Sequence, residues 1–228
     1  MKSVVYNANQ PAQRAGLISW VAILTFLLME LPVRLWLQPD PWLLDAHHWY
    51  FNQPLRLLTE FGLVILLLAV IRCVYPPILQ LPRSQNSLVL GAVLISALLF
   101  GLLEAEQLLK SFSAGLWWWL AWFCTGFCIG IGQELLYRGL LFTTLKRHLS
   151  LSVAATVTTV AFVIAPLHSV RLWHYIQQDE FIVVVILIGI YTGVSMFFQW
   201  LRNHTGSVIA PALVHGAGNA VTWAAVFA

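Results

Sequence analysis

Three short clusters in the C-terminal half of the sequence carry side chains suited to acid–base chemistry. Where a cluster holds several polar residues, they are adjacent or four positions apart, which brings them to one side of a helix. A carboxylate or imidazole that activates water, with amide or imidazole donors that hold a developing oxyanion, would suit hydrolysis. The residues concerned are Gln133, Glu134, Arg138, His168, His215 and Asn219.

The first cluster predicts both an ion pair and a close helix contact. Glu134 and Arg138 are four residues apart and can pair along one helix face. Gly126 and Gly130 share a neighbouring face with Gln133, and small residues there let a second helix approach. The structural alternative is a helix-stabilising ion pair beside a packing groove.

The other two clusters each contain a histidine within an apolar segment. Pro166 removes a backbone hydrogen bond and predicts a bend near the end of its helix, close to His168. His215 and Asn219 are four residues apart and point the same way. The structural alternatives are an interhelical hydrogen bond for His168 and a polar clamp between helices for the other pair.

The composition places these clusters in a membrane. Of the 228 residues, 60% are hydrophobic and 9% are charged, whereas soluble domains contain about 45–50% apolar and about 25% charged residues. This excludes a soluble globular domain and a disordered chain, and the scattered net charge of +3 excludes a nucleic-acid partner. Because the apolar runs are continuous rather than alternating, the sequence predicts an all-α transmembrane bundle and not a barrel.

Seven segments are long enough to span a bilayer, namely 16–37, 55–75, 87–103, 116–145, 151–168, 181–201 and 207–227. Short connections predict a single membrane domain over residues 1–228. An excess of basic residues on the side of the N-terminus places that end in the cytoplasm. The basic residues on that side are Lys2, Arg14, Arg72, Arg83, Arg138, Lys146, Arg147 and Arg202. The acidic residues outside are Asp40, Asp45, Glu104, Glu106, Asp179 and Glu180.

We expect the three clusters to converge within the membrane. The depths expected for Gln133, Glu134, His215 and Asn219 overlap near the middle to inner part of the bilayer. The depth expected for His168 lies nearer the outer face. Helix tilt and the bend at Pro166 would absorb that difference, so we expect one polar cavity between the fourth, fifth and seventh spans. Glu30 and Glu60 lie in or near apolar runs, and we expect each to stay hydrated close to an interface.

The ordered set of motifs resembles the CPBP or Abi family of intramembrane proteins. This family includes CAAX prenyl endopeptidases and bacterial proteins tied to bacteriocin processing or self-immunity. Its pattern is Glu-Glu-x-x-x-Arg, then Phe-x-x-x-His, then His-x-x-x-Asn or Asp. The matching segments are Gln133-Glu134-Leu-Leu-Tyr-Arg138, Ile164-Ala-Pro-Leu-His168 and His215-Gly-Ala-Gly-Asn219, and the resemblance covers about residues 112–228.

The resemblance implies a glutamic intramembrane endopeptidase that uses no metal or other cofactor. Its substrate would be a membrane protein or peptide, cleaved near the membrane-proximal C-terminus for maturation or sorting-signal processing, in a bacterial inner membrane. In the family the first Glu of the pair activates water, so Gln133 occupies the base position. The remaining roles are support by Glu134 and Arg138, assistance to the water by His168, and an oxyanion site at His215 and Asn219.

Gln133 departs from the family pattern at the position that matters most. A neutral amide cannot take a proton from water, so the form with Gln133 is expected to be impaired. Three explanations remain open: a naturally inactive member, an active member in which Glu134 is the base, or an engineered replacement of Glu by Gln.

Other function classes remain as alternatives. A catalytically silent binding protein, such as an immunity factor or a scaffold, would use the same cavity to hold a peptide or lipid. A zinc peptidase would use His168, His215 and Glu134 as ligands, but the sequence lacks His-Glu-x-x-His and pairs its glutamate with arginine. A transporter is disfavoured because no inverted repeat is visible.

Overall fold

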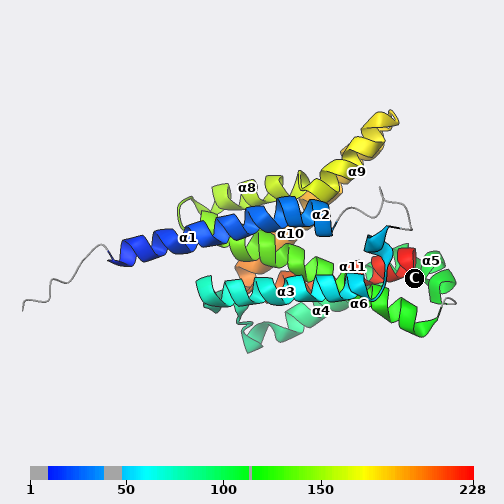
Figure 1. Cartoon of the computed structure of the whole chain (residues 1–228), viewed down its shortest axis with the longest axis horizontal. Helices are drawn as coiled ribbons and strands as arrows, with labels where there is room; N and C mark the ends of the chain where they lie inside the picture. The colour runs from blue at the N-terminus through cyan, green and yellow to red at the C-terminus, as the bar shows by residue number, and fades with distance from the viewer. Residues whose placement is uncertain (1–9, 39–47, 113–114) are drawn as a thin grey trace, which may run out of the picture.

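Long helices run back and forth along the molecule (Figure 1). The computed structural model describes residues 10–38, 48–112 and 115–228, and these contain no strand. The helices are α1 (Gln10–Leu28), α2 (Arg34–Leu37), α3 (Leu55–Val74), α4 (Asn86–Leu103), α5 (Ala105–Ser111), α6 (Leu116–Glu134), α7 (Phe142–Leu145), α8 (Leu151–Val163), α9 (Pro166–Gln177), α10 (Phe181–Thr205) and α11 (Ile209–Phe227). Two π-helical turns, η1 (Met29–Val33) and η6 (Leu135–Leu141), join α1 to α2 and α6 to α7.

The described helices confirm a polytopic membrane bundle. Five segments are long and apolar enough to span a bilayer, namely Gly16–Leu37, Leu55–Val74, Arg83–Leu103, Leu116–Leu145 and Phe181–Thr205, and the bent pair α8–α9 makes a sixth if it counts as one span. The seventh predicted span, α11, has 19 residues but is not among them. Most of its side chains are buried inside the bundle rather than turned toward lipid.

The fifth predicted span is wrong in its extent. Helix α8 stops at Val163, α9 begins at Pro166, and the two helices are bent by 54°. Pro166 lacks the N–H that would bond to the carbonyl of Phe162 four residues earlier, so α8 cannot continue. The bend therefore lies where the sequence predicts it, but His168 belongs to the first turn of α9, which projects from the bundle (Figure 1).

Helix α11 packs along α6 at the centre of the bundle, and glycines make this contact possible. A Cβ on Gly130 would lie 2.7 Å from the Cα of Gly216, and a Cβ on Gly126 would lie 2.5 Å from the backbone oxygen of Asn219. There is no room for a larger residue at either position, which confirms the predicted close approach of a second helix. This contact sets the height of the third polar cluster against the first.

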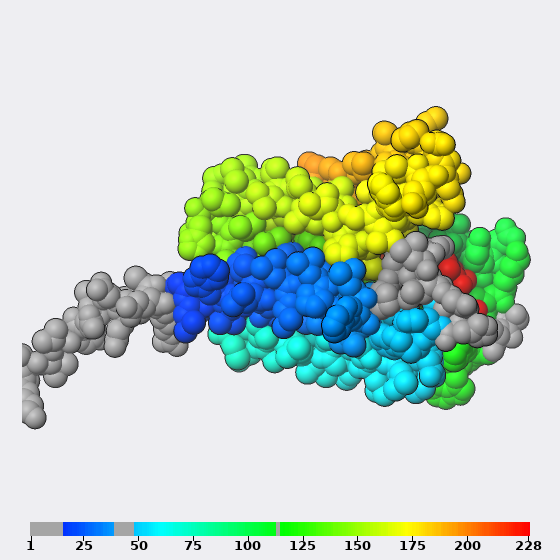
Figure 2. All heavy atoms as spheres, turned by 45° about the horizontal axis from the view of Figure 1, so that its top comes forward, coloured from blue at the N-terminus to red at the C-terminus, as the bar shows by residue number. Residues whose placement is uncertain are grey.

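A second polar network lies in the N-terminal hairpin, which we define as α1, η1 and α2 together with α3. Arg34 pairs with Glu30 at 3.2 Å and Arg56 pairs with Glu60 at 2.5 Å, while Gln38 also donates a hydrogen bond to Glu60. All five side chains are buried, so the expectation that the two glutamates stay hydrated at an interface is wrong. Each carboxylate instead has an arginine one helical turn away. Figure 2 shows α1 lying lengthwise along the bundle between α8 and α3.

The two ends of the bundle carry opposite charge. The loops from α3 to α4 and from α7 to α8, with the last turn of α10, lie at one end (Figure 1). We call it the basic end, because it holds Arg72, Arg83, Lys146, Arg147 and Arg202. The acidic residues Glu104, Glu106, Asp179 and Glu180 follow α4 or precede α10, at the opposite end. Lys2, Asp40 and Asp45, which also entered the charge argument, lie outside the described residues.

Candidate active site

The first cluster lies where α6 widens into the π-helical turn η6. The chain passes from one to the other without interruption, and every residue from Gln133 to Phe142 is buried. A π-helical turn inserted in an α-helix changes the direction of the side chains that follow it and is frequent at functional sites. The predicted span over residues 116–145 is confirmed. The π-helical turn lies within this span and does not interrupt it.

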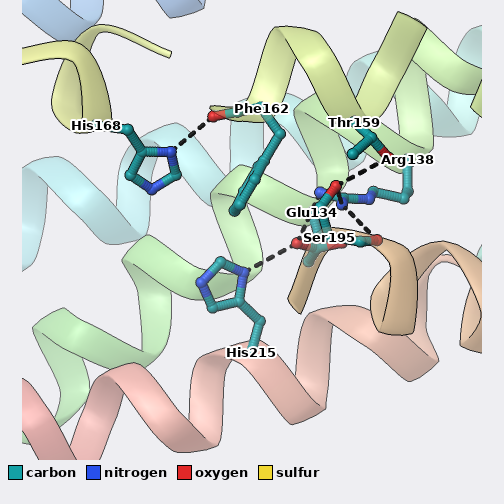
Figure 3. A network of polar contacts seen from close by, with 7 residues as sticks. All are labelled: Glu134, Arg138, Thr159, Phe162, His168, Ser195 and His215. Carbon is teal, nitrogen blue, oxygen red and sulfur yellow. Dashed lines mark hydrogen bonds and ion pairs between the residues drawn. The ribbon is translucent and has the colours of Figure 1, made fainter. Parts of the chain in front are cut away.

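The carboxylate of Glu134 is the centre of the polar contacts (Figure 3). Its Oε1 lies 3.2 Å from Nη1 of Arg138 and 2.9 Å from Nδ1 of His215. Because an ionised carboxylate can only accept hydrogen bonds, the imidazole of His215 donates from Nδ1. The structure thus forms the predicted ion pair between the glutamate and the arginine, and it joins the first cluster directly to the third.

Arg138 is held from two further helices. Its Nη2 donates to the backbone oxygen of Ser195 at 3.0 Å and to Oγ of the same residue at 2.6 Å. That hydroxyl in turn donates to Oγ1 of Thr159 at 3.2 Å (Figure 3). The guanidinium and the Glu134 side chain are both fully buried. Helices α10 and α8 therefore fix the arginine that fixes the carboxylate, a contribution that the sequence analysis missed.

His168 is oriented by the break between α8 and α9. Its Nδ1 lies 2.6 Å from the backbone oxygen of Phe162, a carbonyl that has lost its usual donor four residues later because Pro166 has no N–H. A carbonyl only accepts, so Nδ1 donates, and in the neutral ring Nε2 remains as an acceptor. The ring also stacks on Tyr191 of α10, with 4.0 Å between the ring centroids.

Phe162 brings the two histidines to one place. Its ring centroid lies 4.7 Å from that of His168 and 6.2 Å from that of His215, so the imidazoles are no farther apart than the sum of these distances. Its ring also faces the Arg138 guanidinium at 4.7 Å. Ile164, which aligns with the family's phenylalanine, is 63% exposed, so the aromatic contact to the histidine comes from two residues earlier.

Gln133 and Asn219 are less closely tied to this group. Gln133 is only 5% exposed and precedes Glu134 on α6, whereas Asn219 is half-buried one turn beyond His215 on α11. Neither side chain hydrogen-bonds to another residue in the described part of the chain. Their place in a shared cavity remains a prediction, while Glu134, Arg138 and the two histidines are in contact with one another or with Phe162.

The donor geometry gives the zinc alternative no support. Within residues 10–38, 48–112 and 115–228, no three His, Cys, Asp or Glu side chains are arranged to hold a metal ion. Glu134, the carboxylate ligand of that alternative, is already paired with Arg138 and His215.

Comparison with known proteins finds one matching family. Residues 115–221 match the family described as type II CAAX prenyl endopeptidase Rce1-like. The matched segment begins just before α6 and ends within α11, so it contains all six candidate residues. No curated protein and no solved structure matches the chain.

Proposed function

We propose that this chain, whose residues 115–221 match the Rce1-like family of CAAX prenyl endopeptidases, hydrolyses a peptide bond at the membrane. The substrate is a membrane protein or membrane-anchored peptide, and the bond lies near its membrane-proximal C-terminus. The protein works in a bacterial inner membrane with its N-terminus in the cytoplasm. No metal takes part, and the reaction uses the side chains around Phe162.

The contact between Glu134 and His215 supports this proposal most directly. The glutamate holds the imidazole in one tautomer and orientation, as a carboxylate does for the histidine of a hydrolase. With Nδ1–H bound to Glu134, Nε2 is the ring atom left to face the substrate. When the ring takes up a second proton, Nε2–H donates to the oxyanion that forms as water attacks a carbonyl carbon, and the positive charge of the ring balances it. Asn219, one turn away on the same helix, is the second donor.

The water lies on the side of His168. With Nδ1 bound to the carbonyl of Phe162, Nε2 of this ring accepts a hydrogen bond from the attacking water and orients it. A carboxylate at position 133 takes the proton from that water, which becomes the nucleophile, and later returns the proton to the amine of the departing peptide. Both proton transfers need a basic atom at this position, and the amide of Gln133 provides none.

Glu134 is a poor substitute for the missing base. Its Oε1 already accepts from both Arg138 and His215, and its Oε2 is buried without a hydrogen-bond partner in the described part of the chain. The carboxylate is therefore fixed by the two side chains that it supports. We therefore expect the form with Gln133 to bind substrate and to hydrolyse it slowly. A missing general base typically reduces the rate by about 10²- to 10⁴-fold.

A cleavage assay in liposomes tests the assignment. The substrates are fluorescent peptides with a free C-terminus, anchored to the liposome by a lipid or a single transmembrane helix, and the enzymes are the Gln133 form, Gln133→Glu and Glu134→Gln. We expect Gln133→Glu to raise the cleavage rate by about 10² or more, with little change in substrate binding. Full activity of the Gln133 form, abolished by Glu134→Gln, would show that Glu134 is the base.

One observation favours a second function, a catalytically silent binding protein. The neutral amide of Gln133 is buried at the base position and forms no hydrogen bond to another described side chain, while the surrounding polar contacts are intact. Such a protein would act as an immunity factor or scaffold and hold its peptide or lipid in the same site. If neither Gln133 nor Gln133→Glu cleaves a peptide that both bind, this second function is correct and the hydrolase is not.

A further inference from the structure

Arg202 is a buried cation that has no carboxylate partner among the described residues. The residue lies in the last turn of α10, at the basic end, and is 8% exposed. Its single hydrogen bond to a described residue is a long one, 3.5 Å from Nη2 to Oγ1 of Thr143, and its Nε is buried with no partner. The contrast with Arg138 is clear, because that arginine has both a carboxylate and a serine.

The sequence itself excludes an acidic partner from the neighbouring helices. Residues 10–28, 61–103, 135–178 and 181–228 contain no Asp or Glu, and they supply the described helix ends and connecting loops at the basic end. Along the chain the nearest carboxylates are Asp179 and Glu180, which precede α10 at the opposite end of the bundle. Glu134 is committed to Arg138 and His215. A buried charge without a counter-charge is strongly disfavoured, so an anion from outside the chain is expected at Arg202.

Other groups around Arg202 suit an anion. Gln199, one turn earlier on α10, has a buried side-chain oxygen without a partner and donates from Nε2 to the exposed Asn203. The hydroxyl of Thr143 donates to the backbone oxygen of Arg138 and accepts from Arg202, so it positions the guanidinium and does not itself donate to an anion. The Gln199 amide can turn to offer its N–H₂ group, because O and N exchange places on rotation.

The first turn of α8 lies at the same height along the bundle as Arg202. Ser195 and Thr159 are hydrogen-bonded across the antiparallel helices α10 and α8, so seven residues further along α10 corresponds to seven residues back along α8. This register places Arg202 opposite the beginning of α8 at Leu151, where the helix dipole is positive. The cap at Ser150 satisfies the N–H of Val153, and the other N–H groups of the first turn remain available as donors.

We propose that Arg202, the amide of Gln199 and the first turn of α8 bind the phosphate of an anionic phospholipid. A lipid is favoured over a soluble anion because the site lies at one end of a transmembrane bundle, where headgroups lie, and beside other basic residues. Exposed Asn203 and the partly exposed Thr143 mark the side from which a headgroup reaches the guanidinium. The site is separate from the candidate active site, so binding is measurable without a peptide substrate.

Binding of short-chain lipids to the purified protein tests the site. Dioctanoyl-phosphatidylglycerol and dioctanoyl-phosphatidylcholine are titrated in detergent, with native mass spectrometry and thermal unfolding as readouts. We expect phosphatidylglycerol to bind in preference to phosphatidylcholine, and Arg202→Gln to weaken it about tenfold or more, as loss of a charge-assisted contact implies. The matched control is Lys146→Gln, which removes an exposed charge at the same end and should change the affinity by less than about twofold.

Competition experiments distinguish a lipid headgroup from a soluble phosphate as the bound anion. Inorganic phosphate and glycerol phosphate are added as competitors to the unmodified protein, which also covers the case in which Arg202→Gln does not fold. Weak competition supports a lipid site, whereas displacement of the lipid at equal concentration would overturn it. Unchanged lipid binding by Arg202→Gln would also overturn it. If that variant instead loses only its preference for peptides with a free C-terminal carboxylate over amidated ones, the residue recognises substrate and not lipid.

Discussion

Oε1 of Glu134 lies 2.9 Å from Nδ1 of His215 and is shared with Nη1 of Arg138 at 3.2 Å. One buried oxygen therefore ties α6 to α11 and, through the arginine, to α10. The first consequence is chemical, because the imidazole is held in a single tautomer. The second is structural, because removing either partner leaves a buried charge behind.

Ser195→Ala should loosen Arg138 without removing any charge. The substitution deletes the hydroxyl that accepts from Nη2 at 2.6 Å, and a hydrogen bond to a charged group contributes about 1.5–3 kcal/mol. We expect a lower unfolding temperature and, in the Gln133→Glu background, slower cleavage with little change in KM. Ser87→Ala, at an exposed position on α4, is the control. Unchanged cleavage by Ser195→Ala would remove its positioning role.

Gly130→Ala should separate α6 from α11. The added Cβ would lie 2.7 Å from the Cα of Gly216, and overpacking of this kind costs about 1–3 kcal/mol. Gly189→Ala is the matched control, since a Cβ there meets nothing within 4 Å and alanine is the better helix former. Thermal unfolding in the same detergent compares the two, and equal stability of both variants would contradict the close contact.

Glu60→Gln should destabilise the N-terminal hairpin. It leaves Arg56 buried without its counter-charge, and breaking a buried pair costs about 3–5 kcal/mol. Glu106→Gln removes the same group from an exposed pair with Lys110, also four residues apart, and such pairs contribute little. Denaturant unfolding in mixed micelles measures both. A similar loss of unfolding free energy in the two variants would mean that burial does not determine how much such a pair contributes to stability.

Metal removal should leave the protein unaffected. Because no three His, Cys, Asp or Glu side chains of the described residues are arranged to hold a metal ion, elemental analysis of the purified protein is expected to find no stoichiometric zinc. Cleavage by Gln133→Glu should likewise persist in a chelator. One zinc per chain, lost together with activity in His168→Ala, would establish the zinc peptidase instead.

The sequence alone determined the features that depend on helix periodicity. Spacing of four residues predicted the pair of Glu134 with Arg138, and small residues predicted the close contact at Gly130, because both follow from positions on one helix face. The order of motifs in residues 112–228 also indicated the family. These inferences needed no knowledge of how the helices are arranged.

The tertiary structure decided everything that depends on how one helix is rotated and shifted against another. Ser195 and Phe162 are ordinary residues in apolar segments, and only the packing of α10 and α8 turns them toward Arg138. The same is true of Glu30 and Glu60, whose burial depends on α1 lying against the rest of the bundle. Helix periodicity fixes which residues share a face, but the energy of many side-chain contacts selects which face meets which neighbour.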